Sequence, residues 1–183
     1  DCGIARARVL SEAEKEFRQS LDKAFNAEMH YLERNIEDRF NPESLLPECK
    51  SVVVVTYNYL TDVEQKSDKY RTARYTWIQD YHILVKNLLE QLADKIVNYY
   101  PSVKCRATVD SSAISEKRWA MEAGVGCMGK NGLIHNSNGS FFVIGVLLVD
   151  QFCDEYDQSL PKSDCGACEI CVRSCPVNAL ETP

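Results

Sequence analysis

The chain has 183 residues and a formal net charge of −6, with 45% hydrophobic and 26% charged residues. This composition is typical of a folded protein and excludes intrinsic disorder. The acidic balance provides no general electrostatic footprint for nucleic acid, so any contact with RNA must be local. The longest apolar run, residues 141–149, is too short to span a bilayer, and no signal-peptide pattern opens the chain. We therefore expect a soluble, cytoplasmic protein with no membrane partner.

The first hundred residues predict helices on either side of a buried strand. Ser11 and Glu14 have the spacing of a capping box, and apolar residues behind them recur at helical spacing as far as Phe25. A short second helix is expected at residues 29–34. Four consecutive valines within residues 51–57 predict a strand buried on both faces. Apolar positions that step by three or four from Trp77 to Ile96 predict a long amphipathic helix.

The second half continues this alternation of strands and helices. Residues 103–109 alternate between apolar and polar side chains, which predicts a half-buried strand ending at Asp110. A helix is expected at residues 113–123, a glycine-punctuated loop at residues 124–133 and a buried strand at residues 141–149. Strands interleaved with helices predict an α/β fold, in which a layered sheet is flanked by helices.

The polar stretch at residues 150–164 predicts a linker between two domains of unequal size. We place the larger domain at residues 1–151 and a small cysteine-rich domain at residues 152–183. The chain begins at Asp1 and ends eight residues after its last cysteine. We therefore expect a fragment in which the second domain is truncated.

Four of the nine cysteines fall within eleven residues, in the run Cys165-x-x-Cys168-x-x-Cys171-x-x-x-Cys175-Pro176. This is the spacing of bacterial ferredoxins, whose thiolates bind [4Fe–4S] clusters. A zinc knot is the alternative, but zinc sites usually combine separated Cys-x-x-Cys pairs. In two-cluster ferredoxins the fourth cysteine of such a run ligates the other cluster. We therefore expect two clusters in the full-length protein, with further ligands after Pro183, and a reducing compartment.

A pattern of glycines gives a weaker functional signal than the cysteine run. Gly124, Gly126 and Gly129 match the letters of the dinucleotide-binding fingerprint G-x-G-x-x-G. The pattern follows a predicted helix, whereas the fingerprint requires a strand before it. A nucleotide site is therefore disfavoured, although glycines in this loop would let the backbone approach a large ligand closely.

Short motifs in a fixed order extend along nearly the whole chain. They are Met29-His30-Tyr31-Leu32-Glu33-Arg34, Leu45-Leu46-Pro47, Ser51-Val52-Val53-Val54, Asn58-Tyr59, Arg74-Tyr75, Asp80-Tyr81-His82, Val109-Asp110-Ser111 with Glu116-Lys117, Ala123-Gly124-Val125-Gly126 with Gly129-Lys130-Asn131, Gly139-Ser140-Phe141-Phe142, and the cysteine run. In this order and spacing they resemble the family of epoxyqueuosine reductases, the cobalamin and iron–sulfur enzymes of queuosine-tRNA biosynthesis.

The resemblance implies a fold, cofactors and a reaction. The larger domain would resemble the cobalamin-binding core of reductive dehalogenases, and the smaller would begin a ferredoxin-type domain. The implied activity is an oxidoreductase that reduces epoxyqueuosine to queuosine in tRNA, with cobalamin charged by two [4Fe–4S] clusters. The implied partners are a tRNA substrate and a reductant protein or small-molecule electron donor, and we expect a monomer.

The resemblance assigns the catalytic acid to Asp110, which would also contact the cofactor. A carboxyl at a strand end, desolvated beside a flat apolar macrocycle, would favour its protonated form near neutral pH. The alternative is that Asp110 caps the following helix, a role for which Ser111 and Ser112 are equally suited. Given the resemblance, we favour the acid.

The resemblance also implies further cofactor contacts. Arg34 and Arg74 would meet the polar amide rim of the corrin, or else form surface ion pairs of little energetic weight. Lys130, Asn131 and Ile134 lie in the loop that borders the cofactor in the family, and a buried structural turn is the competing interpretation.

His82 is a further candidate for cofactor contact, but we favour a helix histidine that is satisfied by local hydrogen bonds. The chain also departs from the family pattern at Ala113, where proline is usual, at Cys127, where an aromatic residue is usual, and at Gly132, where Ser or Thr is usual. These departures keep two alternatives open, namely a paralogous corrinoid and iron–sulfur reductase with another substrate and a non-catalytic ferredoxin-like electron carrier.

Overall fold

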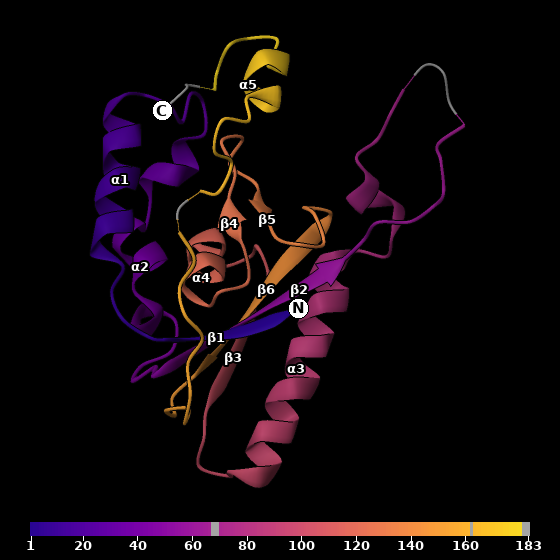
Figure 1. Ribbon diagram of the computed structural model, residues 1–183. Coiled ribbons are helices and arrows are strands. Elements are labelled where there is room, and N and C mark those ends of the chain that lie inside the picture. Colours follow the sequence, from indigo (N-terminus) through magenta and orange to yellow (C-terminus); the bar gives the residue numbers. More distant parts are fainter. Residues whose placement is uncertain (67–69, 162, 181–183) are drawn as a thin grey trace.

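A computed structural model describes residues 1–66, 70–161 and 163–180. Its centre is a four-stranded antiparallel sheet in the order β1-β2-β6-β3 (Figure 1). The strands are β1 (Cys2–Arg6), β2 (Ser51–Asn58), β6 (Phe142–Val149) and β3 (Cys105–Thr108). The valine-rich strand β2 pairs with β6 along its whole length, from Ser51 opposite Val149 to Asn58 opposite Phe142. The two buried strands predicted from apolar runs therefore form the middle of the sheet.

Helices cover both faces of this sheet, so the layered α/β prediction is confirmed. Helices α1 (Ser11–Asp22), α2 (Ile36–Phe40) and α4 (Glu116–Glu122) lie on one face and α3 (Tyr81–Tyr99) lies on the other (Figure 1). Successive strand residues point to opposite faces. Val52 and Val54 accordingly pack with Trp119 of α4, and Val53 packs with Leu89 of α3.

Gly145 in β6 sets how closely α3 can approach the sheet. A Cβ at this position would lie 2.6 Å from Cγ1 of Val85 and 3.0 Å from Cδ1 of Leu89. Both side chains are fully buried. Only glycine therefore accommodates the observed packing of α3 without a shift of the helix.

Shorter elements complete the fold. They are the 3₁₀ helices η1 (His30–Glu33), η2 (Pro42–Ser44) and η3 (Arg74–Trp77), the hairpin of β4 (Cys127–Met128) and β5 (Ile134–His135), and helix α5 (Ile170–Ser174). The hairpin lies within the segment that we predicted as a loop. None of the helices within the described ranges is long and apolar enough to cross a membrane.

Some local predictions are wrong. The N-cap of α1 is Leu10, which makes no side-chain cap, and Glu14 pairs with Arg18 rather than closing a capping box. The helix ends at Asp22, so Phe25 lies beyond it and is exposed. Strand β1 was not predicted at all, because five residues are too few for alternation to stand out from chance.

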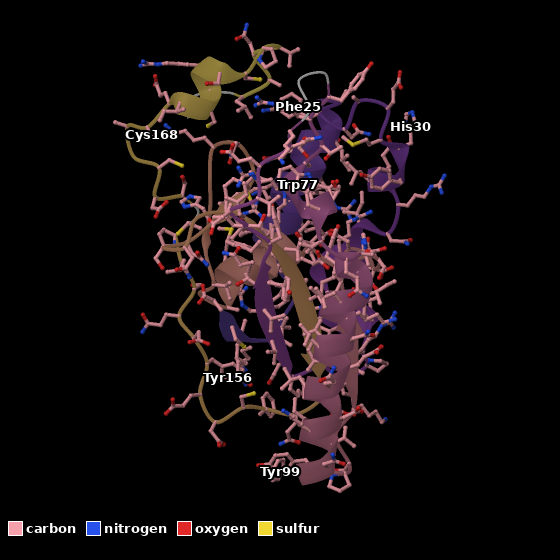
Figure 2. All side chains as sticks on the ribbon, turned by 90° about the vertical axis from the view of Figure 1, so that its right-hand side faces the viewer. Phe25, His30, Trp77, Tyr99, Tyr156 and Cys168 are labelled. Atoms are coloured by element: carbon pink, nitrogen blue, oxygen red, sulfur yellow. The ribbon has the colours of Figure 1, made fainter. Side chains whose placement is uncertain are left out.

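The predicted linker is an extended segment that is hydrogen-bonded to β1 and α4. The backbone N–H of Ile4 donates to Oδ2 of Asp157 at 2.7 Å, and the N–H of Asp157 donates to the Ile4 carbonyl at 2.9 Å. Leu160 donates to the Met121 carbonyl at 3.0 Å. The segment then reaches α5, at the end of the molecule opposite to Tyr99 (Figures 1 and 2).

The predicted division at residues 151 and 152 stays a prediction. Residues 162 and 181–183 of the predicted second domain lie outside the described residues.

Candidate functional site

Asp110 lies just after β3 and presents its carboxyl outward. Its φ of 52° is in the left-handed region, which aspartate tolerates better than most residues. The side chain is 53% exposed. Helix α4 begins only at Glu116 and its N-cap is Ser115, so the interpretation of Asp110 as a helix cap is wrong.

Glu116, the first residue of α4, turns back to hold the Asp110 backbone. The N–H of Asp110 donates to Oε1 of Glu116 at 2.7 Å. Burial, followed by the neighbouring Asp110 carboxyl, raises the pKa of Glu116 to about 9. Glu116 is therefore neutral at physiological pH and fixes the strand end without placing a second negative charge beside Asp110.

The start of α3 supplies the side-chain partners of Asp110. The hydroxyl of Tyr81 donates to Oδ2 of Asp110. Burial, together with this contact, raises the pKa of Tyr81, so the phenol remains a donor. The ring of His82 stacks on Tyr81 with centroids 4.1 Å apart, and its Nε2 lies 4.0 Å from Asp110 Oδ2.

His82 is also held locally, as predicted. Its backbone N–H donates to Oδ1 of Asp80 at 2.9 Å, and its Nδ1 lies 2.8 Å from the same oxygen. Asp80 thus caps α3 and orients the imidazole at once. The local hydrogen bond and the approach to Asp110 are therefore parts of one arrangement.

A row of aromatic rings extends from Tyr81 away from Asp110. Ring centroids are 5.9 Å apart for Tyr81 and Tyr75, 6.3 Å for Tyr75 and Tyr59, and 6.0 Å for Tyr59 and Phe141, all in edge-on arrangements. Tyr75 and Phe141 are exposed. The row offers an apolar surface next to a carboxyl, a combination that suits a flat ligand with one polar reacting group.

The two candidate arginines have different surroundings. Arg74 stacks its guanidinium over Trp77 and Phe141, 5.7 Å from each ring centroid, and so lies at the far end of the aromatic row. Arg34 follows η1, and its backbone N–H donates to the Tyr31 carbonyl at 3.4 Å. Its side chain is exposed.

The hairpin of β4 and β5 carries the other three predicted cofactor residues, Lys130 and Asn131 in its loop and Ile134 at the start of β5. Asn131 accepts a hydrogen bond from the Leu133 N–H at 3.2 Å and so shapes the turn. Ile134 is buried in the core, which leaves only its backbone for a ligand. Two lysines connect this loop to its neighbours. Lys117 of α4 donates to the Gly132 carbonyl of the loop at 2.8 Å, and Lys130 of the loop donates to the Gly166 carbonyl of the cysteine run at 3.1 Å.

The cysteine run contains no disulfide, and the pKa values of two of its thiols are lowered. Hydrogen bonds from the Ser163 side chain and then the Lys130 backbone lower the pKa of Cys165. Backbone N–H groups lower the pKa of Cys175, and that of Ala179 lies 3.3 Å from its sulfur. Thiolates are the form that binds metals, and N–H groups around sulfur are a known means of tuning clusters.

The thiols of the cysteine run are not gathered as closely as the ligands of one tetrahedral ion. A tetrahedral ion with Zn–S bonds of about 2.3 Å holds its thiolates about 3.8 Å apart. Among the described residues, no three of the thiols of Cys165, Cys168, Cys171 and Cys175 lie within 4.8 Å of one another.

Sequence reasoning missed the roles of Tyr81 and Glu116. Both occur in the motifs that carry the family resemblance, Asp80-Tyr81-His82 and Glu116-Lys117. However, 29 positions separate Tyr81 from Asp110, and no local pattern connects them. The available signal for Glu116 was its position shortly after the end of a strand. We predicted a helix start at residue 113, which placed Glu116 inside the helix and hid this signal.

Comparisons with known proteins find similar chains that share one name. The family described as "Epoxyqueuosine reductase QueG, DUF1730" matches residues 39–111. The epoxyqueuosine reductase of Cellulophaga algicola is 35% identical over 184 residues, which cover 100% of this chain and 59% of that protein. The enzyme of Escherichia coli is 36% identical over 95% of this chain and 47% of its own length.

The predicted resemblance to epoxyqueuosine reductase is confirmed. The structure of epoxyqueuosine reductase from Streptococcus thermophilus superimposes with a TM-score of 0.86 at 25% identity, covering 99% of this chain and 50% of that one. Another epoxyqueuosine reductase structure, which contains an epoxyqueuosine-modified tRNA stem loop, has a TM-score of 0.81 at 24% identity and covers 97% of this chain and 48% of its own. The chain thus spans between about half and three fifths of the epoxyqueuosine reductases that it matches.

Proposed function

We propose that the protein containing this chain reduces epoxyqueuosine to queuosine in tRNA, with cobalamin and two [4Fe–4S] clusters as cofactors. Support comes from relatives that carry this name and align with all or nearly all of the chain. Further support comes from a structure of the same fold with an epoxyqueuosine-modified tRNA stem loop. Because the chain spans only part of these relatives, the activity is proposed for the longer protein.

The observation that carries the proposal is the position of the loop at residues 129–133. It is tied to α4 through Lys117, whose neighbour Glu116 holds Asp110, and to the cysteine run through Lys130 and Gly166. A cofactor bound at this loop would be linked to the candidate acid through α4 and to the proposed electron source through Gly166. A mere electron carrier would need no such link.

The residues present suit both cofactors. Free thiols with N–H donors around them match the needs of an iron–sulfur cluster. For the corrin, Asp110 is open to solvent and an aromatic surface lies next to it. The cobalamin contacts we propose are the side chains of Arg34, Arg74, Asp110, Lys130 and Asn131 and the backbone of Ile134. Cobalamin, when bound, supplies a strongly reducing cobalt centre that the clusters recharge with single electrons.

The proposed role of Asp110 is to donate a proton to the epoxide oxygen. Conversion of an epoxide to an alkene consumes two electrons and two protons and releases the oxygen as water. The clusters would provide the electrons, Asp110 one proton and solvent the other. Tyr81 restrains one carboxyl oxygen through its hydroxyl, and the exposure of Asp110 leaves the group accessible to substrate and to solvent.

We propose tRNA as the substrate, a monomeric enzyme in the cytoplasm, and a reductant protein or small molecule as the electron donor. The negative net charge makes a local tRNA contact, centred on the modified nucleoside, more consistent with the chain than a broad basic surface.

The deciding experiment uses the full-length protein, reconstituted anaerobically with iron, sulfide and cobalamin. It is incubated with a reductant and with tRNA that carries epoxyqueuosine, and the nucleosides are analysed by mass spectrometry. We expect a product that has lost one oxygen atom. Cobalamin binding without conversion would instead favour a paralogue with another substrate, and reducible clusters without cobalamin uptake would favour an electron carrier.

A further inference from the structure

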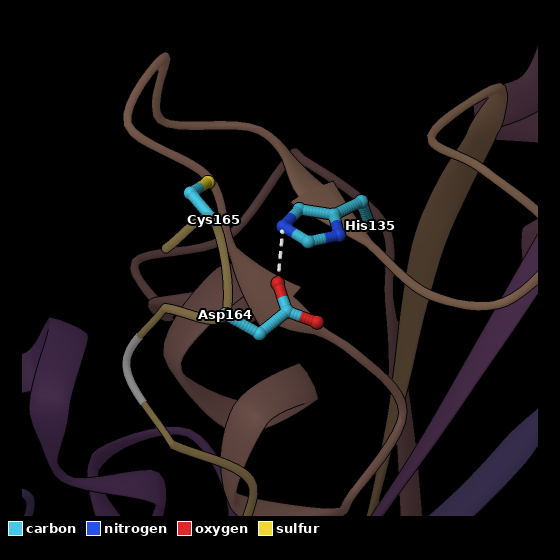
Figure 3. A group of neighbouring side chains, drawn as sticks. All are labelled: His135, Asp164 and Cys165. Atoms are coloured by element: carbon cyan, nitrogen blue, oxygen red, sulfur yellow. Dashed lines mark ion pairs between the residues drawn. The ribbon is translucent and has the colours of Figure 1, made fainter. Parts of the chain in front are cut away.

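A second group of metal-binding side chains lies where the C-terminal segment passes strand β5. His135, Asp164 and Cys165 are neighbours, and each offers one donor atom (Figure 3). These donor atoms all lie within 4.8 Å of one another, and Nε2 of His135 is 3.2 Å from Oδ1 of Asp164. Imidazole, carboxylate and thiolate are the three ligand types that zinc uses in proteins.

The imidazole of His135 is incompletely satisfied as it stands. Its Nε2 is buried, yet within the described ranges no group is placed to form a hydrogen bond with it. The nearby Asp164 oxygen is close enough for an ion pair but does not have hydrogen-bond geometry. A buried polar nitrogen without a partner costs free energy, and a cation between the three donors would satisfy all of them.

The surroundings favour metal binding by Cys165. Cys165 is a free cysteine, so its sulfur is available to bind an ion. The ammonium group of Lys130 is nearby, but it is engaged by the Gly166 carbonyl. A pocket of about 670 Å³, lined in part by His135 and Asp164, leaves room for a water molecule as a further ligand.

We propose that His135, Asp164 and Cys165 bind one divalent transition-metal ion of the zinc type when the iron–sulfur cluster is absent, with water in the fourth position. Cys165 is also the first thiolate of the cysteine run. The ion and the cluster therefore exclude each other, and zinc in excess would block cluster assembly. The proposal goes beyond the enzymatic function and concerns the metal-free chain.

The test titrates the 183-residue chain, prepared anaerobically and free of metal, with Co²⁺ as a spectroscopic probe. We expect one equivalent to bind with a thiolate-to-metal charge-transfer band and the ligand-field bands of a tetrahedral ion, and Zn²⁺ to displace it. His135→Gln and Asp164→Asn should each weaken binding about tenfold or more. Cys165→Ser should remove the charge-transfer band, whereas Cys168→Ser and Cys153→Ser should leave it in place.

Three results would overturn the proposal. The first is an absence of Co²⁺ binding by a chain that circular dichroism shows to be folded. The second is binding that His135→Gln and Asp164→Asn do not change, and the third is equal loss in Cys165→Ser and Cys168→Ser, which would place the ion on the cysteine run. Co²⁺ binding that persists at full cluster occupancy would disprove the exclusion. Failure to form a cluster would count only against the proposed enzymatic function, because the titration needs none.

Discussion

The backbone N–H of Asp110 donates a 2.7 Å hydrogen bond to the carboxyl of Glu116. This bond joins the end of β3 to the first residue of α4, and the next residue, Lys117, binds the Gly132 carbonyl of the hairpin loop. The candidate acid and the candidate cofactor loop are therefore parts of one connected unit.

Glu116→Gln should stabilise the protein increasingly as the pH rises. The folded-state pKa of Glu116, about 9, lies above the value of about 4.3 for an unfolded glutamate. The contribution of protonated Glu116 to the free energy of unfolding is therefore fully present below the unfolded-state pKa. It is lost as the pH rises through the folded-state pKa. Glutamine keeps the acceptor for the Asp110 N–H but carries no charge to desolvate. We expect a gain on the order of 1–3 kcal/mol at pH 8 and little at pH 5, measured by urea unfolding.

Glu116→Ala provides the matched comparison, since it removes the acceptor and should destabilise at both pH values. A Glu116→Gln gain that is equal at pH 5 and pH 8 would contradict a neutral, buried Glu116.

Asp110→Asn should abolish turnover while sparing the fold and cofactor uptake. Asparagine has nearly the same shape but cannot donate the required proton, so we expect a loss of about 10²–10⁴-fold. The measurement is conversion of epoxyqueuosine by the reconstituted full-length protein, with cobalamin absorbance as the control for binding. Unchanged turnover would remove Asp110 as the acid.

Tyr81→Phe should slow the reaction less than Asp110→Asn does. It deletes the hydroxyl that donates to Asp110 but keeps the ring that stacks on His82. We expect about a tenfold fall in the turnover number, consistent with the loss of one positioning hydrogen bond. Tyr99→Phe, at the exposed far end of α3, is the control that should behave as the parent. Equal rates for both variants would show that Tyr81 does not position the carboxyl.

Serine at Cys165, Cys168 or Cys171 should lower the iron and sulfide content of the anaerobically reconstituted full-length protein, because each substitution removes a proposed cluster ligand. Cys153→Ser, outside the run, should retain both. Elemental analysis provides the measurement. Stoichiometric zinc without iron in the parent protein would contradict the cluster assignment.

Gly145→Ala should cost about 1–3 kcal/mol of stability through overpacking against Val85 and Leu89. Gly3→Ala should cost more, because its Cβ would lie 1.9 Å from the backbone oxygen of Ala123, which cannot rotate away as a side chain can. Urea unfolding of the two variants checks the ranking. The reverse order would show that β1 yields more readily than α3.

The sequence by itself determined the layered α/β class, the two central strands, the long helix and the cysteine run. These features depend on periodicity and spacing, which are local properties of the chain. The strand at residues 103–109 shortened to Cys105–Thr108, yet Asp110 still follows its end, as the alternation predicted. Motif order along the chain was enough to identify the resemblance to epoxyqueuosine reductase.

Only the tertiary structure decided which groups surround Asp110 and Cys165. Tyr81 contacts Asp110, which lies 29 residues later, and His135 of the hairpin contacts Asp164 of the C-terminal segment. Because the partners are far apart in the sequence, neither contact produces a periodic pattern. The antiparallel pairing of all strands and the edge position of β1 are decided in the same way. Such contacts depend on how the helices pack on the sheet. The close approach of α3 at Gly145 likewise depends on the shapes of the packed side chains, whose positions the order of residues alone does not reveal.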